Sequence, residues 1–206
     1  MLALPSVPSI LFTEPLALDL MNTDLHLNEG RMDLLDQRSN RTEWLAAEAE
    51  RLGINDTDVA AFTDAVAEAL KAVRAHTTAA VEAARYGTKP PSRALSGLNK
   101  ALRTAPAIPR ARWDGTSVTV TAHRSGPLAT RLTARFAEAA VELLVDPDIS
   151  KVRRCAAPAC MVLFLPRNPN RRWCTPNICG NRARVARYAL RHRSDRADPR
   201  RRKRRN

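Results

Sequence analysis

The stretch from Lys151 to Arg193 reads KVRRCAAPACMVLFLPRNPNRRWCTPNICGNRARVARYALRHR and contains all four cysteines of the 206-residue chain. The cysteines are spaced C-x4-C-x13-C-x4-C, as two close pairs with a short segment between them. Each pair offers two thiolates from one turn, and the segment between the pairs can fold back as a hairpin that brings them together. The spacing therefore predicts a metal site formed by Cys155, Cys160, Cys174 and Cys179.

Zinc is the expected ion, because four thiolates in a closed tetrahedron suit a structural Zn2+ site that needs no redox chemistry. The segment has little apolar material of its own beyond Val162, Phe164 and Leu165, so the metal has to supply much of the folding energy. Three alternatives stay open. Two disulfides would need an oxidising compartment, a four-iron cluster suits the paired spacing less well, and four unrelated buried thiols would rarely cluster in this way.

Positive charge is concentrated in the same part of the chain. Residues 151–206 contain 18 Lys+Arg and 2 acids, whereas the other 150 residues contain 16 bases and 19 acids out of totals of 34 and 21. The two parts therefore carry net charges of +16 and −3. A mildly acidic body with a strongly basic end predicts a polyanion as the partner of that end.

The apolar pattern changes near Ser150 and predicts three parts. Residues 1–150 form a mostly helical domain with one small β-hairpin, residues 151–193 form a treble-clef-like zinc finger with an Arg-rich helix, and residues 194–206 form a disordered basic tail. Glu14–Asn22 is apolar enough for either a buried helix or a buried strand. The other predicted elements are helices over Arg41–Leu52 and Asp56–Tyr86, helices starting at Ser92, Pro127 and Asn181, and a hairpin of Ile108–Trp113 with Ser117–Ala122.

The residues around the second cysteine pair resemble a known family. Arg171-Arg172-Trp173-Cys174 followed by Cys179-Gly180-Asn181-Arg182 is similar to the CGNR zinc-finger family, as are Val152–Cys155 and Leu163–Leu165. The chain departs from the family pattern at Pro166-Arg167 and Thr175-Pro176, neither of which removes a ligand.

Members of that family usually carry an N-terminal ABATE domain. The stretch LALDLMNT at residues 16–23 resembles the opening of this domain, with weaker similarity at Asp33–Leu35 and Trp44-Leu45. The resemblance implies a stress-induced transcription regulator whose finger binds DNA.

The predicted helix after the last cysteine has arginines in most directions. A rigidly aimed helix of this kind can enter a major groove, where arginine binds guanine or phosphate through two hydrogen bonds. The predicted contacts to double-stranded DNA are Arg171, Arg172, Arg182, Arg184, Arg187 and Arg191, with Arg182 the first candidate for reading a base. The six consecutive bases at 200–205 add salt-sensitive affinity without sequence reading. The alternative is an RNA- or protein-binding zinc module with a basic tail. The chain has few aromatic residues that could stack on bases, so single-stranded RNA is less favoured than duplex DNA.

The body contains no catalytic motif. Its histidines are isolated in sequence, and the chain has no HExxH, GxSxG or Gly-rich phosphate loop, so we expect no enzyme activity. A site assembled only in the folded chain is the alternative. Polar residues gather at one end of the first apolar segment, where they either cap a helix or line a pocket for a small-molecule effector: Asp19, Asn22, Thr23 and His26. We expect this domain to act as a sensor or to form a homodimer.

The apolar runs are too short to span a membrane, and the start of the chain lacks the features of a secretory signal. We therefore expect a cytoplasmic protein that associates with the nucleoid when it binds DNA.

Overall fold

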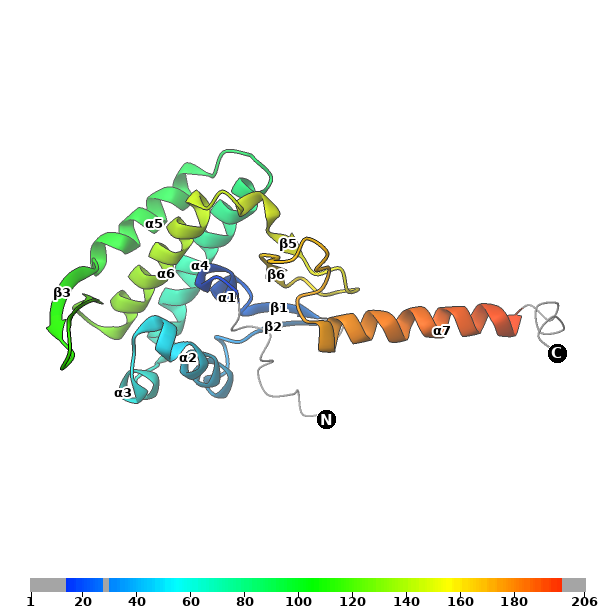
Figure 1. The fold of residues 1–206 in the computed structure, drawn as a ribbon, viewed down its shortest axis with the longest axis horizontal. Coiled ribbons are helices and arrows are strands. Elements are labelled where there is room, and N and C mark those ends of the chain that lie inside the picture. The colour runs from blue at the N-terminus through cyan, green and yellow to red at the C-terminus, as the bar shows by residue number, and fades with distance from the viewer. Residues whose placement is uncertain (1–13, 28–29, 198–206) are drawn as a thin grey trace.

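The chain folds into a helical body, a small finger that contains the four cysteines and packs on the body, and one long helix that extends away from both (Figure 1). The computed structural model describes residues 14–27 and 30–197; the predicted tail beyond residue 197 lies outside this range. The elements are α1 (Leu16–Met21), β1 (Asp24–Leu27), β2 (Gly30–Asp33), α2 (Arg38–Leu52), α3 (Asp56–Ala60), α4 (Asp64–Arg85), α5 (Ser92–Thr104), β3 (Ile108–Trp113), β4 (Val118–His123), α6 (Leu128–Val145), the short helical turn η2 (Ile149–Lys151), β5 (Arg153–Arg154), β6 (Leu163–Phe164), the turn η3 (Pro176–Gly180) and α7 (Asn181–Ala197). The predicted fold class is confirmed.

The core of the body forms where α1, α4, α5 and α6 pack together. All six residues of α1 are buried, so the segment whose pattern fitted either a helix or a strand is a helix enclosed by its neighbours. Trp44 of α2 stacks on Phe136 of α6, with 5.6 Å between the ring centroids. Both rings are fully buried, and this contact joins α2 to the helical core.

The single long helix predicted over residues 56–86 is wrong, because α3 and α4 divide this segment. The backbone is extended at Thr63, with φ −93° and ψ 172°. Phe62, which lies in the break, is buried, and the guanidinium carbon of Arg41 lies 5.6 Å from its ring centroid. The bend turns Phe62 into the core, a role that the spacing of apolar residues alone does not reveal.

α5 lies close against α4. The helix begins at Ser92 as predicted, with Pro91 in the N-cap position. At Gly97 an added Cβ would lie 2.3 Å from the imidazole ring of His76 on α4. A side chain at this position would therefore displace the His76 ring from its place between the two helices.

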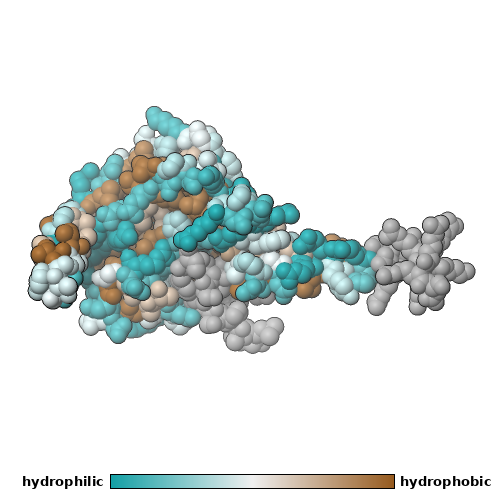
Figure 2. Space-filling model, viewed as in Figure 1, coloured by the Kyte–Doolittle hydropathy of each residue, from teal (hydrophilic) through white to brown (hydrophobic). Residues whose placement is uncertain are grey.

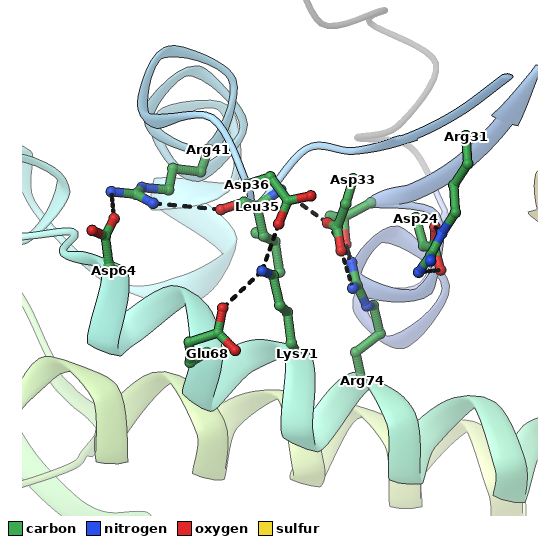
Figure 3. A network of polar contacts seen from close by, with 11 residues as sticks. Asp24, Arg31, Asp33, Leu35, Asp36, Arg41, Asp64, Glu68, Lys71 and Arg74 are labelled. Atoms are coloured by element: carbon green, nitrogen blue, oxygen red, sulfur yellow. Dashed lines mark hydrogen bonds and ion pairs between the residues drawn. The ribbon is translucent and has the colours of Figure 1, made fainter. Parts of the chain in front are cut away.

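The antiparallel hairpin β1–β2 was not predicted from the sequence, and an ion pair joins it to α4 (Figure 3). Arg74 of α4 binds Asp33, and Arg31 binds Asp24 within the hairpin at 2.8 Å. Burial acts to raise the pKa of Asp33, but hydrogen bonds from Arg74 and from the Leu35 amide hold that pKa below its usual value. These strands are only four residues long, and the partner of Asp33 lies 41 positions away in sequence. The local pattern alone therefore did not indicate them.

The finger packs against the body and shares its core. The sequence suggested two separate cores, whereas the buried residues of the structure form one continuous cluster that runs from α1 and α4 to the cysteines and Phe164. The domain boundary at residue 150 stays a prediction. The last helix ends at Ala197, beyond the predicted end at residue 193.

Candidate metal centre and nucleic-acid interface

The backbone of the finger brings the two cysteine pairs to one point. Cys155 follows β5 directly, and its amide donates to the carbonyl of Val162 at 2.9 Å, which closes the β5–β6 hairpin around the first pair. Ala159 adopts a positive φ of 56° in the turn before Cys160. Cys174 follows the long loop, and Cys179 lies in the turn η3. Four short segments thus present one sulfur each to the same place.

The geometry of the four sulfur atoms suits a tetrahedral metal ion. All four are buried and lie within 4.8 Å of one another. Two Sγ–Sγ distances are 3.4 Å, from Cys174 to Cys179, and 3.9 Å, from Cys160 to Cys174. A metal with bonds of about 2.3 Å to four thiolates places them about 3.8 Å apart. A disulfide needs about 2.05 Å, so the spacing does not fit the disulfide alternative.

The electrostatics of the cluster also favour a cation. Hydrogen bonding from Cys160 and then from Cys174 lowers the pKa of Cys155. Hydrogen bonding to Cys155 and then to Cys160 raises the pKa of Cys174. Ionisation of one cysteine in this crowded cluster therefore disfavours ionisation of its neighbours. A bound divalent cation would allow all four to be thiolates, which is the usual state of metal-ligating cysteines.

Trp173 packs beside Gly180, the residue that follows Cys179. It is half-buried, and a methyl group at Gly180 would lie 3.5 Å from its ring, an ordinary contact distance. The amide of the next residue, Cys174, donates to the sulfur of Cys155 at 3.4 Å. Trp173 therefore lies between the residue that follows Cys179 and the third cysteine ligand.

Asn22 joins the body to the finger. It lies just after α1, is buried, and makes both of its amide hydrogen bonds to the backbone of Leu163 in β6. Its Nδ2 donates to the Leu163 carbonyl at 2.9 Å, and the Leu163 amide donates to its Oδ1 at 2.8 Å. The Asn22 side chain thus pairs with β6 as a neighbouring strand would.

Glu14 makes the second connection. Its two carboxylate oxygens accept hydrogen bonds from the Leu165 amide at 2.9 Å and from Arg171 at 2.6 Å. Arg171 also donates to the carbonyls of Trp173 and Cys174, and its guanidinium lies over the Phe164 ring. The structure therefore places Arg171 inside the contact between finger and body, and not on the basic surface where the sequence predicted it. We call the Asn22 and Glu14 contacts together the junction.

The other predicted DNA contacts lie on the outside of the finger and along α7. Arg172 is exposed, Arg182 is half-buried, and Arg184, Arg187 and Arg191 are exposed. The helix begins at Asn181 as predicted; the φ of −67° and ψ of −45° at this residue are already helical, and the turn η3 leads straight into α7. The helix therefore continues directly from the segment that carries Cys179.

The polar residues that were predicted to act together at the end of the first apolar segment have separate roles in the structure. Thr23 donates to the carbonyl of Leu20 at the end of α1 and accepts from Arg74, so it acts in capping and packing. Asn22 belongs to the junction, and the side chain of His26 lies outside the described part. A hollow of about 450 Å³ does lie beside Asn22, between α4 and the finger. That a small-molecule effector binds in this hollow stays a prediction.

Asp19 is fully buried beside a second acid, Glu48. Arg51 reaches both, with 2.6 Å to Asp19 and 2.9 Å to Glu48. Burial raises the pKa of Asp19 to about 8, although the hydrogen bond from Arg51 acts to lower it, and burial also raises the pKa of Glu48. One guanidinium thus serves two carboxyl groups, and Asp19 retains a proton near neutral pH.

Several residues of the interface were not found from the sequence. Glu14 stands beside the first apolar segment, but nothing local indicates that its partner is Arg171. Exposed arginines on the finger itself were also overlooked: Arg153, Arg154 and Arg167. Arg154 lies 3.7 Å from Glu82 of α4, so part of this charge is used within the molecule. Within the described residues, no helix is both long and apolar enough to cross a membrane.

Two known families match the chain in the order that the sequence suggested. Residues 14–147 match the ABATE family, described as "Putative stress-induced transcription regulator". Residues 151–192 match the CGNR zinc finger. No curated protein matches the chain. The ABATE match covers well over half of the sequence, and the finger match includes all four cysteines. The chain therefore belongs to the ABATE family and carries a CGNR zinc finger at its C-terminal end.

Proposed function

We propose that this protein is a zinc-dependent transcription regulator that binds double-stranded DNA through its finger and α7, on the cytoplasmic nucleoid. Zn2+ would be held by Cys155, Cys160, Cys174 and Cys179, because a buried set of four thiolates without other donors suits a structural zinc site. Bound zinc would supply folding energy to the finger, not a chemical step. The family description supports regulation, and the charge of the C-terminal part supports a polyanion as the target.

The observation that carries the proposal is the position of α7. This helix continues directly from η3, the turn that contains Cys179, and then extends away from the body (Figure 1). At about 1.5 Å per residue, its 17 residues span about 26 Å. A B-DNA major groove about 12 Å wide accepts an α-helix. The metal site would thus set the direction of a helix that is free to enter a groove.

The arginines of α7 fall on two sides of the helix. Arg184, Arg187 and Arg191 stand at i, i+3 and i+7, so they share one face. Arg182 lies on another side and is half-buried near the finger. The first-ranked base contact therefore changes from Arg182 to the shared face, with Arg187 at its centre. Arg182 and Arg172 are better placed to bind phosphates near the start of the helix.

The proposal is tested by measuring binding of the full chain to duplexes selected from a random pool and to scrambled duplexes, at two salt concentrations. Arg187→Ala should cost about 1–3 kcal/mol on a selected duplex and much less on a scrambled one, because base contacts carry the discrimination. Arg93→Ala is the matched control, since Arg93 is an exposed arginine on α5 of the body. It removes the same charge and should leave the preference unchanged.

Two outcomes would contradict the proposal. If Arg187→Ala and Arg93→Ala reduce affinity equally on all duplexes, α7 binds polyanions without reading sequence. If hairpin RNA competes better than any selected duplex, the RNA-binding alternative replaces DNA binding.

A further inference from the structure

One face of the β3–β4 hairpin consists only of apolar residues. Side chains alternate along a strand, and residues paired across the ladder share a face. The register pairs Pro109 with Ala122, Ala111 with Val120 and Trp113 with Val118. We call these residues the apolar face: Pro109, Ala111, Trp113, Val118, Val120 and Ala122. The opposite face carries Arg110, Arg112, Thr119, Thr121, His123 and Ile108.

This apolar face is turned toward solvent, the reverse of the usual orientation. All six of its residues are exposed, with Trp113 at 67% and Val120 at 70%. The half-buried residues of the hairpin, Thr119 and His123, belong to the opposite face. Figure 2 shows apolar surface gathered at the end of the molecule where β3 and β4 lie.

A hairpin of this kind is not expected to stand alone. An isolated two-stranded hairpin is marginally stable at best in water, and β3 and β4 pair with each other but make few contacts with other described elements. Exposed apolar patches of this type mark interaction surfaces in soluble proteins. The face carries no charged side chain, so it offers nothing to a polyanion.

We infer that the apolar face is a self-association surface, on which a second copy of the chain docks through the same face. A two-fold contact needs one self-complementary patch, and two uniformly apolar sheets can pack face to face about 10 Å apart. At about 3.3 Å per residue and about 4.8 Å between strands, the face measures about 20 Å by about 10 Å. Stable interfaces bury about 800 Å² of accessible surface on each partner, and this small face alone offers less, so we expect a weak dimer that needs micromolar protein to form.

The position of the hairpin leaves the rest of the protein accessible in such a dimer. Figure 1 shows β3 and β4 at one end of the long axis and α7 at the other. Docking through the apolar face therefore covers neither the finger nor α7, and it needs no nucleic acid.

The test is sedimentation velocity of the full chain, stripped of nucleic acid at high salt, over a concentration series from low to high micromolar. The wild type should shift from monomer toward dimer. Val120→Asp places a charge in the centre of the apolar face and should remain monomeric at every concentration. Because Val120 is exposed, this change should leave the helical circular dichroism spectrum unchanged.

Thr121→Asp is the matched control, since it introduces the same charge one residue further along β4 on the opposite face. It should dimerise like the wild type. A wild type that stays monomeric throughout would overturn the inference, and so would a Val120→Asp protein that dimerises as strongly as the control. Neither result depends on DNA binding, so failure here is distinct from failure of the proposed function.

Discussion

In the body, most buried residues are apolar side chains from helices that pack against one another, whereas in the finger they are four cysteines and a few apolar residues on or beside strands two residues long. Body helices such as α4 and α6 bury a continuous face. The finger has no such face, and its elements meet at the sulfur cluster. A small module of this kind needs a metal or another cross-link to fold.

The comparison also shows how the two regions depend on each other. Asn22 and Glu14 bind the backbone of the finger hairpin, so the body supplies hydrogen bonds that the finger cannot make internally. The metal would fold the finger, and the junction would fix its position. Each of the following predictions separates these two contributions.

The largest expected effect is loss of a ligand. Cys174→Ser should unfold the finger and leave the helices of the body folded, because metal binding contributes about 10–16 kcal/mol to small zinc modules. Hydrogen exchange of finger and body peptides measures both regions at once. Fast exchange in the finger alone is expected, and it should be reproduced by chelating the wild type. Equal loss of protection in α4 and α6 would show that the body also depends on the metal.

The next largest expected effect is a loss of stability in the body. Phe136→Ala removes the ring that stacks on Trp44 and should lower the free energy of unfolding of the body by about 3–5 kcal/mol. Urea unfolding followed by circular dichroism measures this, with Phe136→Leu as a milder control. Metal content per chain should be unchanged at low urea. A variant that loses its metal while the body is still folded would contradict the separation of the two contributions.

The junction should contribute far less than the metal. Asn22→Ala leaves the amide and carbonyl of Leu163 without their partners, at about 1–3 kcal/mol for each buried group. We expect faster hydrogen exchange at the β5–β6 hairpin with the metal still bound. Asn22→Asp keeps the acceptor for the Leu163 amide and should have an intermediate effect. Unchanged exchange in Asn22→Ala would mean that the finger is held by the other contacts.

The smallest effect, over the single unit between pH 6 and pH 7, is a dependence on pH. The pKa of Asp19 is about 8 in the folded protein, above the ordinary value of 3.8. The folded state therefore holds this proton more tightly, and its contribution to stability declines as pH rises from about 4 to about 8, by at most about 1.4 kcal/mol per pH unit. Asp19→Asn should flatten this decline in urea unfolding at pH 6 and 7. Parallel pH profiles of the two proteins would show that Asp19 is ionised throughout.

Local patterns predicted those features of the molecule that local chemistry determines. The spacing of the four cysteines indicated the sulfur cluster, the alternation around Asp114-Gly115 indicated β3–β4, and the periodicity after Pro127 indicated α6. In each of these, the deciding residues lie within one segment of the chain.

Contacts between distant residues explain what the sequence did not predict. Asn22 and Leu163 are 141 positions apart, and neither has a local feature that indicates the other. The same holds for Glu14 and Arg171, so Arg171 was assigned to DNA although its charge is used at the junction. The break before α4 depends on where Phe62 finds space in the core, which only the packed helices decide.

The central claim is that the metal site directs α7 toward duplex DNA. The most direct test compares the affinity of metal-free protein for a selected duplex with that of the same protein after reloading with one equivalent of Zn2+. An isolated helix of this length is marginal in water, so the metal-free protein should retain only weak, strongly salt-dependent binding without preference for the selected duplex. One equivalent of Zn2+ should restore both affinity and preference. Equal affinity and equal preference with and without the metal would contradict the account.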